Sequence, residues 1–249
     1  MPIQRYNDQN IDLLAAVFQR RYEPNFALGN AVSLLAMLPA IRGVWSFASV
    51  DSAVVNDNSG QGRGLTISGM TTGLQGLAQY GDFDGANDYL HRPTETDLQI
   101  TGALSMGAWV YFDALAEHGI LGKWLAAGNL RGYRLYRTAG GLIEFAVSAD
   151  GTATTVKQSA AVANSTWVFV GGRYTPSTSV SVVVNRTWLD NVAAIPAAIY
   201  GTAVDLEAGR TDGGSYLNGR IALAFLAAES LSDAEFGVIY EQTRALFGV

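Results

Sequence analysis

The sequence contains no cysteine, which excludes disulfide bonds, thiolate nucleophiles, zinc ribbons and iron–sulfur clusters. Its two histidines, His91 and His118, are too few for a multi-histidine metal site, and Lys123 and Lys157 are its only lysines. Charged residues make up 15% of the 249 residues, against an ordinary share of about 25%. The formal net charge is −6, and neutralising phosphates requires clustered basic side chains. We therefore expect no nucleic-acid partner.

Long apolar runs are also missing. The most apolar stretch, residues 31–41, contains Ser33 and Pro39 and is shorter than the ~20 residues that a membrane-spanning helix needs. It also starts too late for an ordinary signal peptide. We therefore expect no membrane span, and a protein that stays where it is made or is released by cell lysis or particle assembly.

The first forty residues predict two helices with unusually broad apolar faces. One is expected over residues 8–22 and the second over residues 28–38, with Pro24 and Pro39 as stop signals. The apolar arcs are wider than a surface helix of a monomer needs. Two interpretations stay open, since the helices either pack on the domain that follows or dock on another protein chain. The candidate partner-interface residues are Ile11, Leu14, Phe18, Leu34, Leu35 and Leu38.

From about residue 43 the pattern changes to short strands and turns. Apolar residues at positions 143, 145 and 147 alternate with other residues at the period of two that is typical of a strand. The 28 glycines and the closely spaced turn signals are typical of a β-sandwich. We therefore divide the chain into a helical arm, residues 1–42, and a sandwich domain, residues 43–249.

The chain ends in a further predicted helix. Ser232-Asp233-Ala234-Glu235 has the pattern of a capping box, in which the serine and the glutamate satisfy backbone N–H groups of the first turn. The helix is expected to run to about Leu246, on the edge or the back of the sandwich.

An ordered series of motifs runs through residues 43–247. Its clearest members are Phe83-Asp84-Gly85, Ser105-Met106-Gly107-Ala108-Trp109-Val110, Gly122-Lys123-Trp124 and Tyr216-Leu217-Asn218-Gly219-Arg220-Ile221. The series resembles the laminin G-like, concanavalin A-like lectin and glucanase domains. The resemblance implies an all-β fold: a two-sheet antiparallel jelly-roll sandwich. Two positions depart from the family pattern, since Arg186 replaces the usual glycine after Asn185 and Ala222 replaces the usual acidic residue.

Glucanases of this fold resemble one another in a Glu-x-Asp-x-x-Glu motif that supplies both catalytic carboxylates. Glu95 and Asp97 match its start, but Ile100 stands where the second glutamate should be. His91 and His118 have no serine or aspartate partner at motif spacing and are expected on the surface or in loops. We therefore predict no catalytic residue and no enzyme activity.

Oxygen ligands for calcium gather at Asp82, Asp84 and Asp88, although their spacing does not match an EF-hand loop. The alternative is that Asp84 and Asn87 are turn residues that bond to their own backbone. Calcium at these three aspartates is the one metal that the sequence suggests, and no other cofactor is expected.

Sugar recognition requires aromatic faces and planar polar groups on loops. The candidates are Trp188, Tyr216, Trp124, Arg131 and Asp212. Trp188 is the most suggestive of them, because it lies in what the sequence indicates is a polar chain reversal, residues 185–191. For Trp124, as for Tyr133, the favoured alternative is that the side chain fills the core of the sandwich.

Three classes of function remain, and the first is favoured. It is a non-catalytic structural or adhesion protein on a particle surface, similar to bacteriophage decoration, capsid-associated and tail-associated proteins. Its partners would be other virion chains, copies of itself and a cell-surface glycan, and its location would be the virion or, alternatively, the extracellular space. The second class is a stand-alone carbohydrate-binding module, and the third is a glycoside hydrolase.

Overall fold

The computed structural model describes residues 24–76 and 78–249. Within these residues the strands form two sheets, and every strand pairing is antiparallel. The spatial order of the eight-stranded sheet is β15 (Thr187–Asn191), β14 (Ser179–Val184), β13 (Trp167–Thr175), β8 (Leu104–Phe112), β17 (Asn218–Ala227), β6 (Ala78–Asp84) and β5 (Thr71–Gln75). The eighth strand, β1 (Ile41–Trp45), also pairs with β17.

The nine-stranded sheet packs against it. Its spatial order is β12 (Thr155–Ala161), β11 (Leu142–Val147), β10 (Tyr133–Arg137), β9 (His118–Lys123), β16 (Leu206–Ala208), β7 (Tyr89–Arg92), β4 (Leu65–Ser68), β3 (Val54–Val55) and β2 (Val50–Asp51). Sequence-distant strands are neighbours in both sheets, as in the jelly-roll sandwich that the motif series implies. The predicted all-β sandwich is therefore confirmed.

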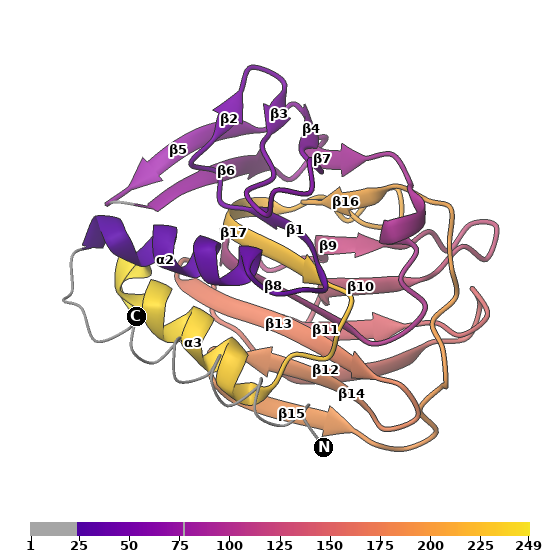
Figure 1. Ribbon diagram of the computed structural model, residues 1–249. Coiled ribbons are helices and arrows are strands. Elements are labelled where there is room, and N and C mark those ends of the chain that lie inside the picture. The colour runs from indigo at the N-terminus through magenta and orange to yellow at the C-terminus, as the bar shows by residue number, and fades with distance from the viewer. Residues whose placement is uncertain (1–23, 77) are drawn as a thin grey trace.

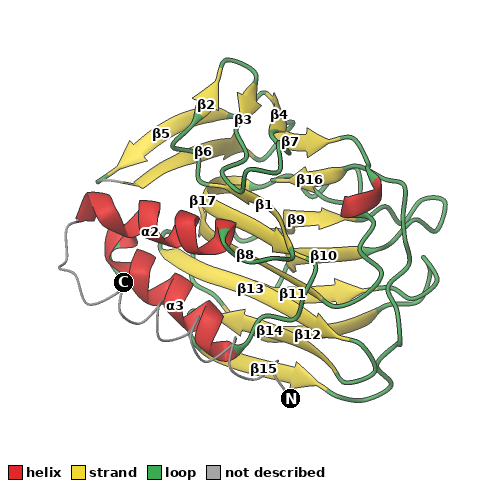
Figure 2. Ribbon diagram, in the orientation of Figure 1, coloured by secondary structure: helices red, strands yellow, loops and turns green. Residues whose placement is uncertain are grey.

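Helices add a third layer. Figures 1 and 2 show α2 (Pro24–Ala36) and α3 (Asp233–Thr243) lying across the eight-stranded sheet, and the two helices contact each other. Short 3₁₀ helices, η1 (Thr96–Leu98) and η2 (Arg244–Phe247), complete the described elements. Among the described residues no helix is both long enough and apolar enough to cross a membrane.

Local sequence signals explain where these helices begin. Pro24 is the first residue of α2. Proline is favoured there because the N–H that it lacks would have no hydrogen-bond partner within the helix. Pro24, expected as the stop signal of the 8–22 helix, is therefore also the start of α2. That earlier helix lies outside the described residues. At α3 the predicted capping box forms: the Ser232 hydroxyl accepts from the backbone N–H of Glu235, and the Glu235 side chain accepts from that of Ser232.

The eight-stranded sheet is apolar on both sides because it lies between two layers. In β8, Met106, Ala108 and Val110 are buried between the sheets, whereas Trp109 is buried on the opposite side under the helices. Trp109 stacks on Phe247 of η2, with ring centres 4.4 Å apart. The C-terminal helices are therefore part of the core of this domain.

The structure accounts for both departures from the family pattern, the first through this layering and the second through the conformation of one residue. Ala222 is buried in the apolar layer under the helices, where an unpaired acidic side chain would be costly. The tight turn between β14 and β15 forms without a glycine after Asn185. Asn185 itself adopts the left-handed conformation, with φ of 54°, which asparagine tolerates better than most residues.

Candidate functional site

The outer faces of the two sheets differ in chemistry. The helices α2 and α3 lie over the outer face of the eight-stranded sheet (Figure 1), and buried side chains of α2, α3 and η2 form an apolar cluster with it. On the nine-stranded sheet, one outward row runs from His91 in β7 through Glu207 in β16, Gly122 in β9 and Arg134 in β10 to Ala146 in β11. We define the polar face of this sheet by Tyr89, His91, Trp124, Arg134, Tyr136, Glu144, Glu207, Arg210 and Tyr216.

Arg134 is the best-supported group of the polar face. Its guanidinium lies 4.6 Å from the ring centre of Trp124 and 4.1 Å from that of Tyr136. Its Nη2 donates to Glu144 Oε1 at 2.8 Å. The Arg134 side chain is only 17% exposed, so stacking and ion pairing hold it in one orientation at the surface. Burial raises the pKa of Tyr136 to about 12, so its hydroxyl is neutral at physiological pH.

Arg210 is held in a similar way. Its guanidinium lies 3.5 Å from the ring centre of Tyr89, forms an ion pair with Glu207 and donates to Tyr216 Oη at 3.4 Å. Burial by itself would lower the pKa of Arg210, but its hydrogen bonds to Glu207 and Tyr216 raise it above the usual value. Arg210 is therefore a permanent cation whose charge is matched by a neighbouring carboxylate.

The fold gives His91 a carboxylate partner that its sequence context did not suggest. Its Nδ1 lies 3.3 Å from Asp205 Oδ2, although the two residues are 114 positions apart. Its ring centre is 5.6 Å from that of Tyr89. His91 therefore belongs to the polar face. The expectation of a loop or surface position is wrong for His118, which is buried in β9 with its ring nitrogens near the carbonyl oxygens of residues 216 and 114.

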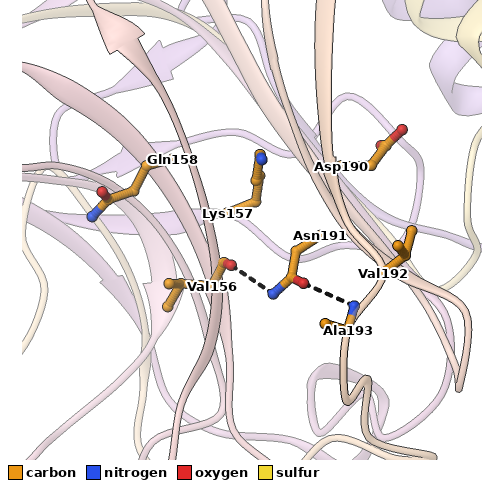
Figure 3. A pocket seen from close by; sticks show the side chains of 7 residues that line it. All are labelled: Val156, Lys157, Gln158, Asp190, Asn191, Val192 and Ala193. Atoms are coloured by element: carbon orange, nitrogen blue, oxygen red, sulfur yellow. Dashed lines mark hydrogen bonds between the residues drawn. The ribbon is translucent and has the colours of Figure 1, made fainter.

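An open hollow of about 540 Å³ lies where β12 and β15, the edge strands of the two sheets, approach each other (Figure 3). The Asn191 side chain crosses between these edges, because its Nδ2 donates to the carbonyl oxygen of Val156 at 3.0 Å. Lys157 and Asp190 line the same hollow and bring one charge of each sign.

Gln158 connects this hollow with the polar face. It lines the hollow, and its Nε2 donates to Glu144 Oε2 at 2.7 Å. Glu144 in turn accepts from Arg134 through its other oxygen. The Gln158 amide therefore extends the Arg134 cluster to β12, the edge strand that also borders the hollow.

This arrangement is suited to a ligand with ring-shaped apolar patches and many hydroxyl groups. Aromatic side chains pack against C–H groups, while arginine, carboxylate and amide groups donate to and accept from hydroxyls. The polar groups already hold one another in place, which reduces the entropy that is lost on binding. Such a combination of groups fits a carbohydrate.

Four of the five residues predicted to bind sugar lie on or beside the polar face. Trp124 and Tyr216 contact its two arginines. Trp124 is buried, as the alternative expected, with 5% of its surface exposed, although it belongs to neither of the two apolar clusters. Asp212 is next to Trp124, since its backbone N–H donates to the Trp124 carbonyl oxygen at 3.1 Å. Arg131 lies in the loop between β9 and β10 and donates to the carbonyl oxygen of Thr152 at 3.0 Å.

Trp188, the fifth residue, lies on the other sheet. Residues 187–191 form strand β15, so the expectation that Trp188 lies within a chain reversal is wrong. Its ring packs edge-on against Phe236 of α3, with centres 4.9 Å apart, and Arg173 lies 4.2 Å from its centre. A small hollow of about 120 Å³ borders it. Trp188 is therefore not brought together with the other four candidates.

The three candidate calcium ligands are engaged with other groups. Asp84 Oδ1 accepts from three backbone N–H groups of residues 86–88, which lower its pKa, as expected for the turn alternative. Asp88 Oδ2 accepts from the backbone N–H of Asp84, and Asp82 pairs with Arg220 at 3.5 Å. Within residues 24–76 and 78–249, no group of three or more His, Asp or Glu side chains is placed to hold a metal ion. Calcium at this turn stays a prediction without geometric support.

Glu95 and Asp97, the start of the incomplete glucanase motif, are paired with arginines. Arg63 lies 2.6 Å from Asp97 and 3.4 Å from Glu95, and Arg92 lies 2.6 Å from Glu95. Ile100, at the position of the missing glutamate, is buried in the core. These contacts give both carboxylates structural partners in the loop that leads to β8.

The predicted partner-interface residues fall into two groups. Leu35 is completely buried against the eight-stranded sheet, so its contacts are within its own chain. Leu34 and Leu38 are half-buried, and the neighbouring Met37 is 69% exposed. Ile11, Leu14 and Phe18 lie outside the described residues. A partner interface therefore stays a prediction, and Leu35 is not available to it.

The sequence predicted no functional role for Arg134, Arg210, Tyr89 or Lys123. Lys123 is fully buried, and its Nζ donates to Thr94 Oγ1 at 2.9 Å. A signal for Arg134 was present, because it alternates with the core residues Tyr133 and Leu135 along β10. Its aromatic and acidic partners come from other strands, so the cluster itself has no local pattern.

Comparison with known proteins identifies the family and the fold. The family model described as the concanavalin A-like lectin/glucanases superfamily matches residues 84–235. No curated protein sequence matches the chain.

Similar solved structures include three with TM-scores from 0.62 to 0.64. They are a Trypanosoma rangeli sialidase in complex with sialic acid (13% identity, 88% of this chain covered), the binding domain of botulinum neurotoxin DC in complex with SialylT (9%, 84% covered) and a structure of botulinum neurotoxin type C concerned with its interaction with two ganglioside molecules (10%, 87% covered). The chain spans 38%, 52% and 53% of their respective lengths. At these identities the likeness establishes the fold.

Proposed function

Because this chain belongs to the concanavalin A-like lectin/glucanases superfamily, we propose that it is a non-catalytic glycan-binding protein whose ligand lies on the polar face. The observation that carries the proposal is the Arg134 cluster, in which a cation stacked on Trp124 and Tyr136 is paired with Glu144, and Glu144 also accepts from Gln158. Three structurally similar proteins have names or titles that mention sialic acid, SialylT or gangliosides, which supports a carbohydrate as the class of ligand.

A glycan array tests the proposal directly. Fluorescently labelled full-length protein should bind a defined set of glycans, and Arg134→Ala should abolish that binding because it removes the stacked donor at the centre of the cluster. Arg186→Ala is the matched control. Arg186 is also an arginine paired with a glutamate, Glu241 at 3.0 Å, but it lies in the β14–β15 turn on the other sheet. Equal binding by both variants would place the ligand elsewhere, and absence of binding by the wild type would refute the proposal.

The absence of catalysis is part of the proposal. It is supported by the pairing of Glu95 and Asp97 with Arg63 and Arg92, and by Ile100 in place of a second glutamate. We expect no release of reducing sugar from β-glucans or from any glycan bound on the array. Hydrolysis that disappears in Glu95→Gln would contradict this part and leave glycan binding intact.

We further propose that the protein is displayed on a particle surface as a virion component, with the extracellular space as the alternative location. The exposed apolar side chain of Met37, beside the half-buried Leu34 and Leu38, supports attachment to another chain through the N-terminal region. Mass spectrometry of purified particles and of secreted fractions tests the location. Recovery only in the cytosol of intact producing cells would contradict it.

A further inference from the structure

The two arginines of the polar face, and His91 beside them, each have a carboxylate as neighbour. Arg134 donates to Glu144 at 2.8 Å, and Arg210 forms an ion pair with Glu207. The His91 ring nitrogen lies 3.3 Å from Asp205. A bound carboxylate on this face would have to compete with a carboxylate that the protein already supplies at each of these three positions.

The surroundings add further negative charge. Glu117 is exposed beside the Tyr136 hydroxyl, to which it is hydrogen-bonded, and Asp212 lies beside Trp124. Two cations lie at the periphery: Lys157, in the hollow with Asp190, and Arg131, which donates to the carbonyl oxygens of residues 151 and 152. Carboxylates therefore outnumber cations around the Arg134 and Arg210 clusters, and the whole chain carries a net charge of −6.

Paired arginine and glutamate groups are well suited to hydroxyls. A guanidinium that is already paired still presents N–H donors, and the carboxylate presents acceptor lone pairs at a fixed distance, so adjacent hydroxyls of a sugar can bond to both. The same pairs offer no uncompensated positive charge to an anion.

We propose that the polar face selects uncharged glycans and that Glu144 and Glu207 are the residues that exclude acidic ones. This inference rests on the proposed function and specifies its ligand class. The proposed ligand class differs from the ligands named for two of the structurally similar proteins, which are sialic acid and SialylT.

The test uses matched pairs of glycans that differ only in a terminal sialic acid, such as lactose and 3′-sialyllactose. An array compares the pairs first. Calorimetry then measures the affinities of the best-bound neutral glycan and of its sialylated form. We expect the neutral member to bind at least about tenfold more tightly than its sialylated form. Raising the salt concentration should leave the affinity for the neutral member unchanged, because no net charge is neutralised on binding.

Glu144→Gln provides a gain-of-function test, since it keeps the shape of the side chain and frees the charge of Arg134. It should reduce the ratio of the affinities for the neutral and the sialylated glycan by about tenfold, mainly through tighter binding of the sialylated member. Glu207→Gln tests the Arg210 pair in the same way and serves if the first variant does not fold. Arg186→Ala, on the other sheet, is the control and should leave the preference unchanged.

The outcomes separate the two proposals. Tighter binding of sialylated glycans by the wild type, above all if Lys157→Ala or Arg131→Ala removes it, would overturn the inference and leave glycan binding standing. An unchanged affinity ratio in both Glu144→Gln and Glu207→Gln would show that these glutamates do not select the ligand, and it would also overturn the inference. No binding of any glycan would refute the proposed function and the inference with it.

Discussion

Lys123 shows how a single residue links the fold of this protein to pH. It is fully buried, and its Nζ donates to Thr94 Oγ1 and to the carbonyl oxygen of Val204. Burial lowers its pKa from 10.5 to about 8, and the charges of Asp205 and Glu95 oppose this effect only in part. The unfolded chain therefore holds the proton more tightly than the folded one, so stability increases as the pH rises from about 8 towards 10.5.

This shift predicts a measurable pH profile. The free energy of unfolding should increase by about 2 kcal/mol between pH 7.5 and pH 9.5 as Lys123 loses its proton in the folded state. Urea denaturation at several pH values measures the profile. Lys123→Met should lack this increase, whereas Lys157→Met should keep it, because Lys157 is only half-buried. Parallel profiles for the wild type and Lys123→Met would contradict the assignment.

At the scale of elements, the C-terminal helices form a layer that closes the second core. Phe247 of η2 stacks on Trp109, with centres 4.4 Å apart, and lies 4.9 Å from the ring centre of Trp167. The Trp109 indole N–H donates to Thr243 Oγ1 at 2.7 Å. The helical layer is therefore joined to the sheet by aromatic packing and by a buried hydrogen bond.

Phe247→Ala should reduce the free energy of unfolding by about 3 kcal/mol, because it opens a cavity between two tryptophan rings. It should also change the near-ultraviolet circular dichroism, which reports the packing of those rings. Val249→Ala is the matched control, since Val249 is two residues further on and 40% exposed. A loss below about 0.5 kcal/mol would show that η2 does not hold this core.

The start of α3 offers a separate test of a local signal. Ser232→Ala removes the hydroxyl that accepts from the Glu235 N–H, and it should lower stability by about 1 kcal/mol. Ser52→Ala, at an exposed position of the β2–β3 turn, should be neutral. Thermal melts of both variants against the wild type measure the difference, and equal melting temperatures would mean that the capping box contributes nothing.

At the scale of the whole molecule, α2 connects the sandwich with the region ahead of it. Ala31 and Leu35 are completely buried against the sheet, while Met37 is exposed. Burial of side chains such as Leu35 is worth roughly 1.5–3 kcal/mol each. The part of α2 that carries Ala31 and Leu35 is therefore integral to the fold, in line with the interpretation that this helix packs on the domain.

Two truncations separate folding from attachment. Deletion of residues 1–23 keeps α2 and is the reference protein. Deletion of residues 1–40 removes α2 as well and should lower the melting temperature by about 10 °C relative to that reference. An equal melting temperature for the longer truncation would show that α2 is dispensable.

Sedimentation of the same proteins tests the predicted partner interface at Ile11, Leu14 and Phe18. If these residues join copies of the chain, the full-length protein should form oligomers and the protein without residues 1–23 should be monomeric. A monomeric full-length protein would contradict self-association through this region.

The sandwich and its terminal helix could be predicted from the sequence because both depend on local patterns. The period of two over residues 143–147 specifies a strand with one face in the core, and Ser232 with Glu235 specifies a helix start, whatever the rest of the chain does. The helix over residues 28–38 was also predictable in kind, and its observed bounds differ because a proline is accepted in the first turn of a helix.

The polar face was decided by the tertiary structure. Arg134 meets Glu144 through the pairing of β10 with β11, and His91 meets Asp205 only because β16 is inserted beside β7. The sequence supplied the residue types and their alternation along each strand. It could not supply which strands become neighbours or in which register, because those follow from the packing of two sheets whose partners are far apart in the chain.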